Sequence, residues 1–124
     1  MDRINAENMH YRTLNEHIRN SSKREIAVEN TLGQRFIGSG CLGKDIHIYG
    51  IPGNALGAYL TQTDITVYGN AQDATGDAMN DGTITSGFPL AVSNHFTGQA
   101  AEIAVREGSL LAIWDRKNGF PTRN

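Results

Sequence analysis

The chain has 124 residues, a formal net charge of −2 and a single cysteine. This length suits one domain with a modest hydrophobic core, so we assign residues 1–124 to a single domain. Lys and Arg are scattered rather than clustered, which gives no electrostatic footprint for nucleic acid or an anionic membrane, and we expect neither partner. One cysteine cannot form an internal disulfide, and the polar N-terminus lacks a signal-peptide pattern, so we expect a cytoplasmic protein.

A short amphipathic helix is predicted over residues 6–20. Tyr11, Leu14 and Ile18 share one helical face, and the polar run from Asn20 to Ser22 is a typical helix end. We expect this capping helix to cover the first open edge of the sheet that follows, because an uncovered row of backbone groups invites aggregation.

An internal repeat of 19 residues dominates residues 25–85. The run Asp45-Ile46-His47-Ile48-Tyr49-Gly50 returns as Asp64-Ile65-Thr66-Val67-Tyr68-Gly69, with an earlier copy from Glu25 and a partial later copy from Gly82. A repeat this short indicates a solenoid. We therefore predict a mainly β protein, a right-handed parallel β-helix of about three coils, in which matching residues stack at about 4.8 Å.

This fold predicts ladders of equivalent residues from coil to coil. The expected ladders are Tyr49 on Tyr68, Ile46 on Ile65 on Ile84, and Cys41 on Leu60 on Met79. Six repeat glycines are expected to be structural: Gly38, Gly50, Gly57, Gly69, Gly76 and Gly82. At corners of the coil, positive φ or close backbone approach excludes a Cβ atom.

Residues 86–124 are predicted to form a divergent, short α/β tail. The next coil would place glycine at 69 + 19 = 88 and 76 + 19 = 95, where the chain has Phe88 and His95. We therefore expect the solenoid to end after Gly82, followed by a helix over 97–107 with Gly108 as its C-cap and a strand over 109–114. The tail either folds over the open C-terminal edge or leaves that edge free to pair with another chain.

Three glycine-rich stretches carry a family resemblance: Asn30 to Gly38, Gly50 to Tyr59, and Gly69 to Gly82. Together they resemble the glycine-repeat (GXGXG) domain of the glutamate synthase large subunit, and they are also similar to the glycine-repeat subunit of formylmethanofuran dehydrogenase. The resemblance spans roughly residues 9–85. It implies a right-handed β-helix with a structural role, packed against flavin-bearing and amidotransferase domains. The family's catalytic cysteine, flavin and iron–sulfur ligands lie elsewhere, so none is carried over.

The chain departs from that family after Gly82, where family members continue for several more coils. It therefore looks truncated. One hypothesis is a shortened paralogue whose tail has acquired a new role; another is a frameshifted gene whose last third is out of frame. Translation of the coding DNA in the other two frames separates them.

Two motifs suggest ligands, and we interpret both as structural. Gly38-Ser39-Gly40-Cys41-Leu42-Gly43 matches the G-x-G-x-x-G string of dinucleotide-binding folds, but a strand rather than a helix is predicted after it. Asp73, Asp77 and Asp81 could suggest Ca²⁺, yet their spacing does not fit the nine-residue calcium repeat. We interpret these carboxylates as solvated turn residues or Asx-turns.

No catalytic, cofactor-binding or metal-ligating residue is predicted. His10, His17, His47 and His95 lack metal-site spacing and cysteine partners. Cys41 is interpreted as a small buried residue of its ladder rather than a nucleophile. Ser39 and the run Ser93-Asn94-His95 supply single parts of a catalytic set without the others.

Three functions are open at this point. The first is a non-catalytic assembly domain whose flat β surface or open edge binds a partner, either another copy or a glutamate synthase-like protein; a dimer would cover Phe88, Phe96 or Trp114. The alternative is an accessory subunit of a glutamate synthase or formylmethanofuran dehydrogenase redox complex, not an enzyme on its own. The third is a small-molecule module that uses the corner Gly53-Asn54-Ala55.

Overall fold

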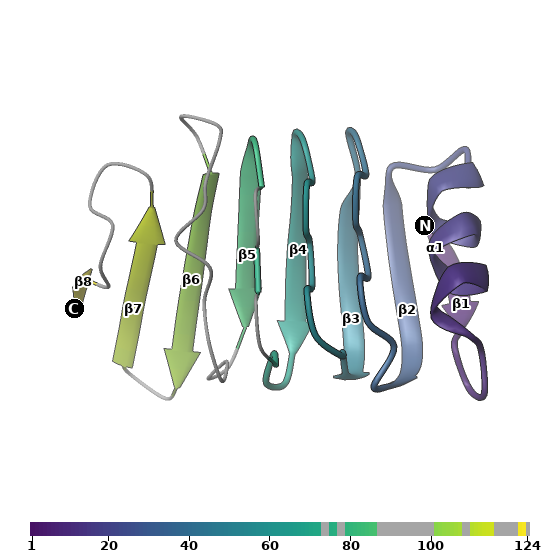
Figure 1. Ribbon diagram of the computed structural model, residues 1–124, viewed down its shortest axis with the longest axis horizontal. Coiled ribbons are helices and arrows are strands. Elements are labelled where there is room, and N and C mark those ends of the chain that lie inside the picture. The colour runs from purple at the N-terminus through teal and green to yellow at the C-terminus, as the bar shows by residue number, and fades with distance from the viewer. Residues whose placement is uncertain (73–74, 77–78, 87–100, 108–109, 116–121, 124) are drawn as a thin grey trace.

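The protein is a parallel β-solenoid of about three turns with one short helix (Figure 1). The computed structural model describes residues 1–72, 75–76, 79–86, 101–107, 110–115 and 122–123. The elements are β1 Asp2–Asn5, α1 Tyr11–Asn20, β2 Glu25–Leu32, β3 Asp45–Ile51, β4 Thr63–Tyr68, β5 Gly82–Ser86, β6 Ala101–Glu107, β7 Leu110–Asp115 and β8 Thr122–Arg123. They form one sheet in chain order, β1 to β8. The predicted parallel β-helix is confirmed.

Residues that are 19 positions apart in the repeat are paired in neighbouring strands of the sheet. Ile46 pairs with Ile65, and Ile65 pairs with Ile84. The turn segments behind the sheet follow the same rule: the amide of Gly57 donates to the carbonyl of Ile37 at 2.8 Å, and Asn80 donates to Leu60 at 2.8 Å. Each donor lies 20 residues after its acceptor (57 − 37 = 20; 80 − 60 = 20), as a parallel ladder of period 19 requires. The coils are therefore joined by backbone hydrogen bonds on more than one side.

The interior of the coil is filled by the predicted ladders. On the sheet side, Ile46, Ile65 and Ile84 have no exposed surface. The opposite wall carries the second predicted ladder, with Cys41 2% exposed and Leu60 and Met79 fully buried. Burying each large aliphatic side chain contributes roughly 1.5–3 kcal/mol, so these ladders are the main source of stability.

Two repeat glycines, Gly50 and Gly82, lie where the backbone of the preceding coil approaches too closely for a side chain. A Cβ atom on Gly82 would lie 1.9 Å from the backbone oxygen of Thr63, and one on Gly50 would lie 2.3 Å from the oxygen of Thr31. All six repeat glycines have positive φ, from +68° at Gly57 to +156° at Gly69. The glycine spacing thus reflects the distance between neighbouring coils as well as the turns.

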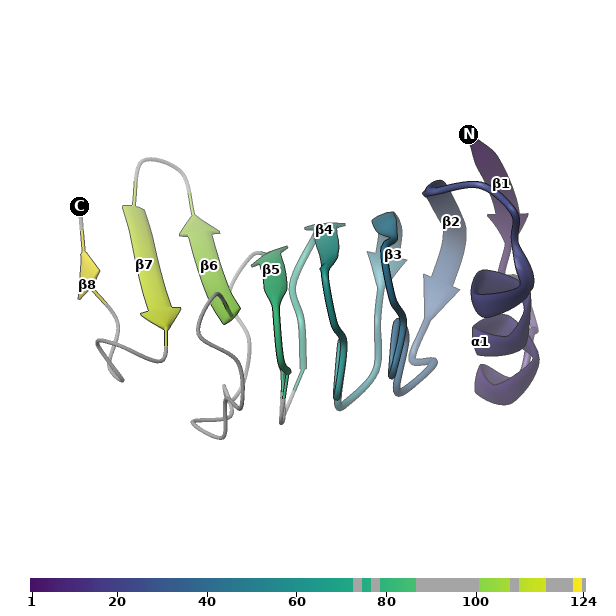
Figure 2. The ribbon, with the colours of Figure 1, turned by 90° about the horizontal axis from the view of Figure 1, so that it is seen from above.

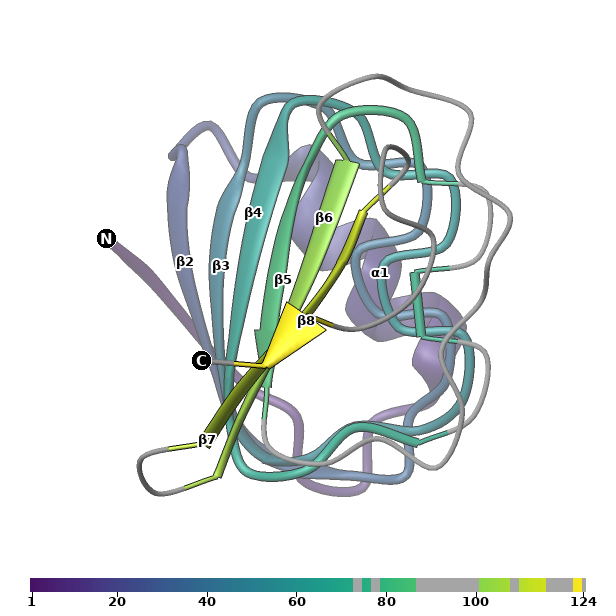
Figure 3. The ribbon, with the colours of Figure 1, turned by 90° about the vertical axis from the view of Figure 1, so that its left-hand side faces the viewer.

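The N-terminal end differs from the prediction in one respect. The helix begins at Tyr11, and the residues before it include the strand β1, which pairs in parallel with β2 and so takes the edge position of the sheet. Helix α1 covers the open end of the coil instead, as the view along the solenoid shows (Figure 3). The expectation that the helix covers the sheet edge is therefore wrong. A strand of four residues with one buried apolar residue, Ile4, leaves too short a pattern to recognise.

Side chains from the cap and first coil replace the contacts of a missing coil. The Oδ1 atom of Asn15 accepts the amide of Gly38 at 3.0 Å. In the next coil the equivalent amide, that of Gly57, donates to a backbone carbonyl. The Nε2 atom of Gln34 donates to the carbonyls of Ala6 at 2.9 Å and Met9 at 3.1 Å. Asn15 and Gln34 are both buried, so the end of the solenoid is closed with its polar groups paired.

The parallel sheet continues beyond Gly82, against the prediction. Gly82 pairs with Ala101 and Ile84 with Ile103, again 19 residues apart, so residues 101–107 form strand β6 and the predicted helix over 97–107 is wrong for this part. The alternation of Ile103 and Val105 with polar or small residues favours a strand. Residues 97–100 and Gly108 lie outside the described residues.

The predicted strand over 109–114 corresponds to β7. It runs antiparallel to β6, with Ile103 opposite Trp114, and ends the parallel stack. Seen from above, β7 and β8 lie at the end of the row opposite to α1 (Figure 2). Phe88, His95 and Phe96 lie outside the described residues.

Candidate functional site

The outer face of the sheet carries a stacked pair of exposed tyrosines. Tyr49 on β3 and Tyr68 on β4 are partners in the register, and their rings lie 4.6 Å apart at an interplanar angle of 3°. Their exposed fractions are 42% and 53%. The predicted tyrosine ladder is therefore confirmed, and the two stacked rings form an exposed aromatic ridge on the surface.

A polar chain of three side chains leads into this ridge. His47 Nε2 lies 3.3 Å from Asp45 Oδ1, and His47 Nδ1 lies 3.1 Å from the hydroxyl of Tyr68. The imidazole thus bridges a carboxylate of its own strand and a phenol of the next. The spacing of the histidines bears only on metal binding and does not predict this contact, because Tyr68 belongs to the following coil. The repeat places Tyr68 beside Tyr49, two residues from His47, and this is the clue that the sequence offers.

The pKa of Tyr68 is raised above its ordinary value. Partial burial is the largest cause, followed by Tyr49 and the carboxylate of Asp45. A phenol with a raised pKa stays protonated at neutral pH and is a poor nucleophile or base. The chain from Asp45 to Tyr68 is therefore suited to hydrogen bonding with a bound group and not to forming a phenolate.

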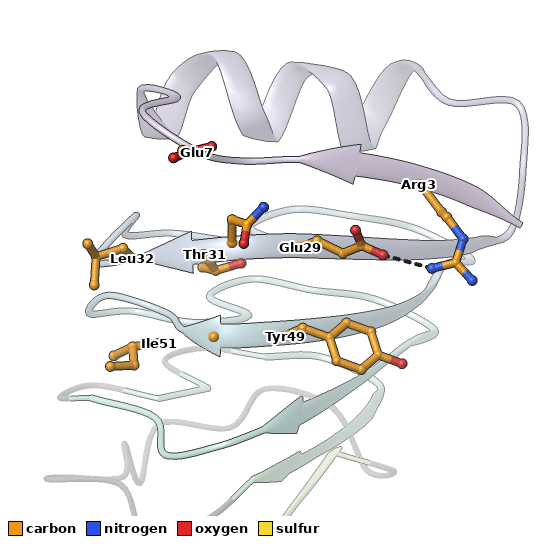
Figure 4. A pocket seen from close by; sticks show the side chains of 9 residues that line it. Arg3, Glu7, Glu29, Thr31, Leu32, Tyr49 and Ile51 are labelled. Atoms are coloured by element: carbon orange, nitrogen blue, oxygen red, sulfur yellow. Dashed lines mark hydrogen bonds and ion pairs between the residues drawn. The ribbon is translucent and has the colours of Figure 1, made fainter.

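A hollow of about 900 Å³ lies beside Tyr49 (Figure 4). Its lining residues are Arg3, Glu7, Glu29, Asn30, Thr31, Leu32, Tyr49, Gly50 and Ile51. At one end Arg3 and Glu29 form an ion pair at 2.7 Å, and at the other end Leu32 and Ile51 are 75% and 50% exposed. The hydroxyl of Thr31 is buried and has no hydrogen-bond partner in the described part of the chain. The hollow therefore offers charged, aromatic and apolar contacts within one depression.

A β-bulge in β2 creates this shape. Before the bulge Val28 pairs with Ile48, and after it Thr31 pairs with Gly50, so β2 has one residue more than β3 (31 − 28 = 3; 50 − 48 = 2). Asn30 in the bulge has φ of 59°. Bulges redirect side chains and bend the strand.

The outer face is acidic near the beginning of β2, β3 and β4. Glu25, Asp45 and Asp64 are consecutive partners in the register, so three carboxylates lie in one row. Arg24 approaches Asp64 at 3.9 Å. Like charges directly opposite one another destabilise a sheet, so this row favours contact with cations.

The structure places the other predicted residues away from this face. Cys41 is buried, and burial raises the pKa of its thiol, which agrees with its interpretation as a ladder residue. After the run from Gly38 to Gly43 comes strand β3 and not a helix, as expected. Asp73, Asp77 and the run from Ser93 to His95 lie outside the described residues. Within the described ranges, no group of three or more His, Cys, Asp or Glu could hold a metal ion.

Two further predicted features serve the backbone. His10 is the N-cap of α1, where its Nδ1 atom accepts the amide of Arg12 at 3.1 Å. At the corner Gly53-Asn54-Ala55, the amide of Gly53 donates to Gln34 at 2.8 Å, and the carbonyl of Asn54 accepts from Phe36 at 2.9 Å. The backbone of this corner is thus used between coils. No helix in the described part of the chain is long and apolar enough to cross a membrane.

These features define a β-solenoid whose outer sheet face is aromatic and apolar at one end and acidic at the other. The chain is 49% identical over 84 residues to the uncharacterized protein MJ1350 of Methanocaldococcus jannaschii, an alignment that covers 62% of this chain and 32% of the relative. The chain thus spans about a third of the length of the curated relative it matches. No family model and no solved structure matches the chain.

Proposed function

We propose that this chain is a non-catalytic assembly module that binds a partner protein through the outer face of its sheet. The observation that carries the proposal is the exposed stack of Tyr49 on Tyr68 beside the exposed Leu32 and Ile51. Exposed apolar groups rimmed by polar side chains mark interaction sites, and tyrosine is enriched among the residues that dominate binding energy.

The polar chain beside the tyrosines supports binding over catalysis. The phenol of Tyr68 is protonated at neutral pH at its ordinary pKa, and the raised pKa moves it further from ionisation; His47 has a partner at each ring nitrogen. Such groups fix the orientation of a partner through hydrogen bonds at the edge of an apolar contact.

The resemblance of the glycine repeats names a glutamate synthase-like protein as the proposed partner. In that setting the alternative function is an accessory subunit of a glutamate synthase or formylmethanofuran dehydrogenase redox complex.

Affinity purification of the tagged chain from its source cells tests the proposal, with the double variant Tyr49→Ala/Tyr68→Ala and the control Leu42→Ser compared under the same conditions. Leu42 is 64% exposed and lies outside the sheet, which makes it a matched surface change. We expect the double variant to weaken partner binding more than about tenfold and the control to bind as the parent does. Equal recovery with both variants would refute the proposal.

The visible absorbance of the purified complex distinguishes the two proposed roles. A flavin or molybdopterin chromophore that co-purifies with the parent but not with the tyrosine variant favours the accessory-subunit role. Light scattering on the purified chain tests the remaining possibility, that the partner is a second copy.

A further inference from the structure

We propose that the outer face, and the hollow at its apolar end, bind an extended partner segment with large apolar side chains at one end and Lys or Arg at the other. This inference rests on the proposed function, because it names the chemistry of the partner at the same surface. The juxtaposition that carries it is the gradient along β2, β3 and β4, from carboxylate near the start to aromatic or aliphatic side chains at the end.

The gradient is clearest on β3. The residues Asp45, His47, Tyr49 and Ile51 alternate with the buried Ile46 and Ile48 and the glycine Gly50, so all four belong to the outer face. A bound segment in extended conformation has the same period of two residues. Every second side chain of a segment that lies along β3 therefore faces one of these four residues.

The apolar end is shaped to accept a side chain. Leu32 and Ile51 are partners in the register and form one wall of exposed aliphatic surface, while Tyr49 forms the next. An aliphatic or aromatic side chain placed on this wall would remove apolar surface of both molecules from water.

The charges favour a basic partner. Five carboxylates border the face, on Glu7, Glu25, Glu29, Asp45 and Asp64. Two of them have a guanidinium partner: Glu29 pairs with Arg3 at 2.7 Å, and Asp64 lies 3.9 Å from Arg24. Glu7 forms no ion pair within the described part of the chain, and in Figure 4 it lies on the same side as Leu32. A cationic segment therefore finds carboxylates without a guanidinium partner among the described residues at Glu7 and in the row that begins with Glu25 and Asp45.

The openness of the surface favours a segment over a small molecule. Small ligands are held in concave pockets that bury most of their surface. Here Leu32 and Ile51 remain at least half exposed, and the contacts run along strands rather than converging on a point. A protein segment can span these separated contacts at once.

A synthetic peptide tests the inference. Thr occupies every second position of the peptide. The positions between them are Lys in one half of the peptide and Leu in the other half. The reversed sequence is included because the direction of binding is open. The control peptides replace Lys by Glu or Leu by Ser. Titration calorimetry with the purified chain should show binding of a Lys/Leu peptide and of neither control. Equal binding of the Glu peptide would overturn the charge argument.

Protein variants locate the contact. We expect Leu32→Ser/Ile51→Ser to weaken the Lys/Leu peptide about tenfold. We expect Asp45→Asn/Asp64→Asn to weaken it about fivefold at low salt, with the difference disappearing at high salt. The matched controls Leu42→Ser and Glu16→Gln should bind as the parent does, and circular dichroism checks that all variants fold. Unchanged affinity in the Leu32→Ser/Ile51→Ser variant would overturn the inference.

The outcomes separate this inference from the proposed function. A native partner that is lost with Tyr49→Ala/Tyr68→Ala but retained with Leu32→Ser/Ile51→Ser would refute the segment and leave the assembly role. Retention with both variants would refute both. Self-association that the Leu32→Ser/Ile51→Ser variant abolishes would assign the hollow to a second copy and overturn the basic segment.

Discussion

The inner and outer faces of the sheet are made by the same strands but follow different rules. On the inner face Ile46, Ile65 and Ile84 repeat one residue type at a spacing of 19, and all three are fully buried. On the outer face the residue type changes from coil to coil. His47 is aligned with Thr66, and the carboxylate of Asp64 is followed in the register by Thr83. The repeat therefore maintains the stacking of the coils, whereas the departures from it on the outer face produce the candidate site.

The largest effect is expected at a glycine that separates two coils. Gly82→Ala would put a Cβ atom 1.9 Å from the backbone oxygen of Thr63, which no side-chain movement can relieve. We expect a loss of more than about 4 kcal/mol in the free energy of unfolding, measured by urea denaturation. The control is Gly43→Ala, where φ is +71° and nothing lies within 4 Å; it should lose only about 1–2 kcal/mol. Equal losses would mean that φ alone explains the repeat glycines.

A pair of substitutions at β4 compares the two faces directly. Ile65→Ala removes a fully buried side chain and should lower stability by about 2–5 kcal/mol. Tyr68→Ala removes a side chain that is 53% exposed and should lower the free energy of unfolding by less than about 1.5 kcal/mol while weakening partner binding. Thermal unfolding and the pull-down give both quantities. Comparable destabilisation by the two variants would contradict the division between a structural and a functional face.

The cap should show an intermediate effect. Asn15→Ala leaves the buried amide of Gly38 without its acceptor and should cost about 1–3 kcal/mol. Asn15→Asp keeps an acceptor at the same position but loses the donor to the carbonyl of Tyr11, so it should recover part of the loss. Urea denaturation of the three proteins measures this order. An unchanged stability in Asn15→Ala would show that the cap closes the coil without this bond.

The smallest effect is a pH dependence from the inner ladder. Burial raises the pKa of the Cys41 thiol in the folded protein above its ordinary value of 9.0. Above that value the unfolded chain loses the proton while the folded chain keeps it. Stability should therefore fall as pH rises beyond about 9, by at most about 1.4 kcal/mol per pH unit. Cys41→Ala should remove this part of the pH dependence. Urea denaturation of both proteins between pH 8 and 10, about one unit to either side of the ordinary pKa, measures the difference. An identical slope in the two proteins would contradict the burial of the thiol.

The sequence is most informative where one physical requirement recurs in every coil. The 19-residue spacing predicts the pairing of β3 with β4 and the ladder that includes Cys41 and Leu60, because stacking demands matching shapes at matching positions. The prediction fails at β6. Glycine marks the corners of a coil, and β6 keeps Ile103 in register with Ile84 although the expected corner glycines are missing from the sequence. It also fails at β1, whose single buried residue cannot show a period.

The candidate site was less accessible to prediction. The contact of His47 with Tyr68 joins two coils at positions that are not register partners, so matching the copies shows only that Tyr68 lies beside Tyr49, two residues from His47. The hollow depends on the extra residue between Val28 and Thr31, which the sequence records only as a first repeat spacing of 20 instead of 19. The sequence does not show which residue is the inserted one; the pairing of the strands is needed to locate it.

The cap formed by Asn15 and Gln34 gives the molecule a direction of growth. Their amide groups match the first coil alone, since each later coil already has a backbone neighbour on that side. Duplicated units added between the cap and the first coil would have to reproduce both side chains, whereas units inserted further along need only the glycine spacing. Lengthening by tandem duplication is therefore easiest downstream, and the same asymmetry tells a protein engineer where an extra coil can be spliced in.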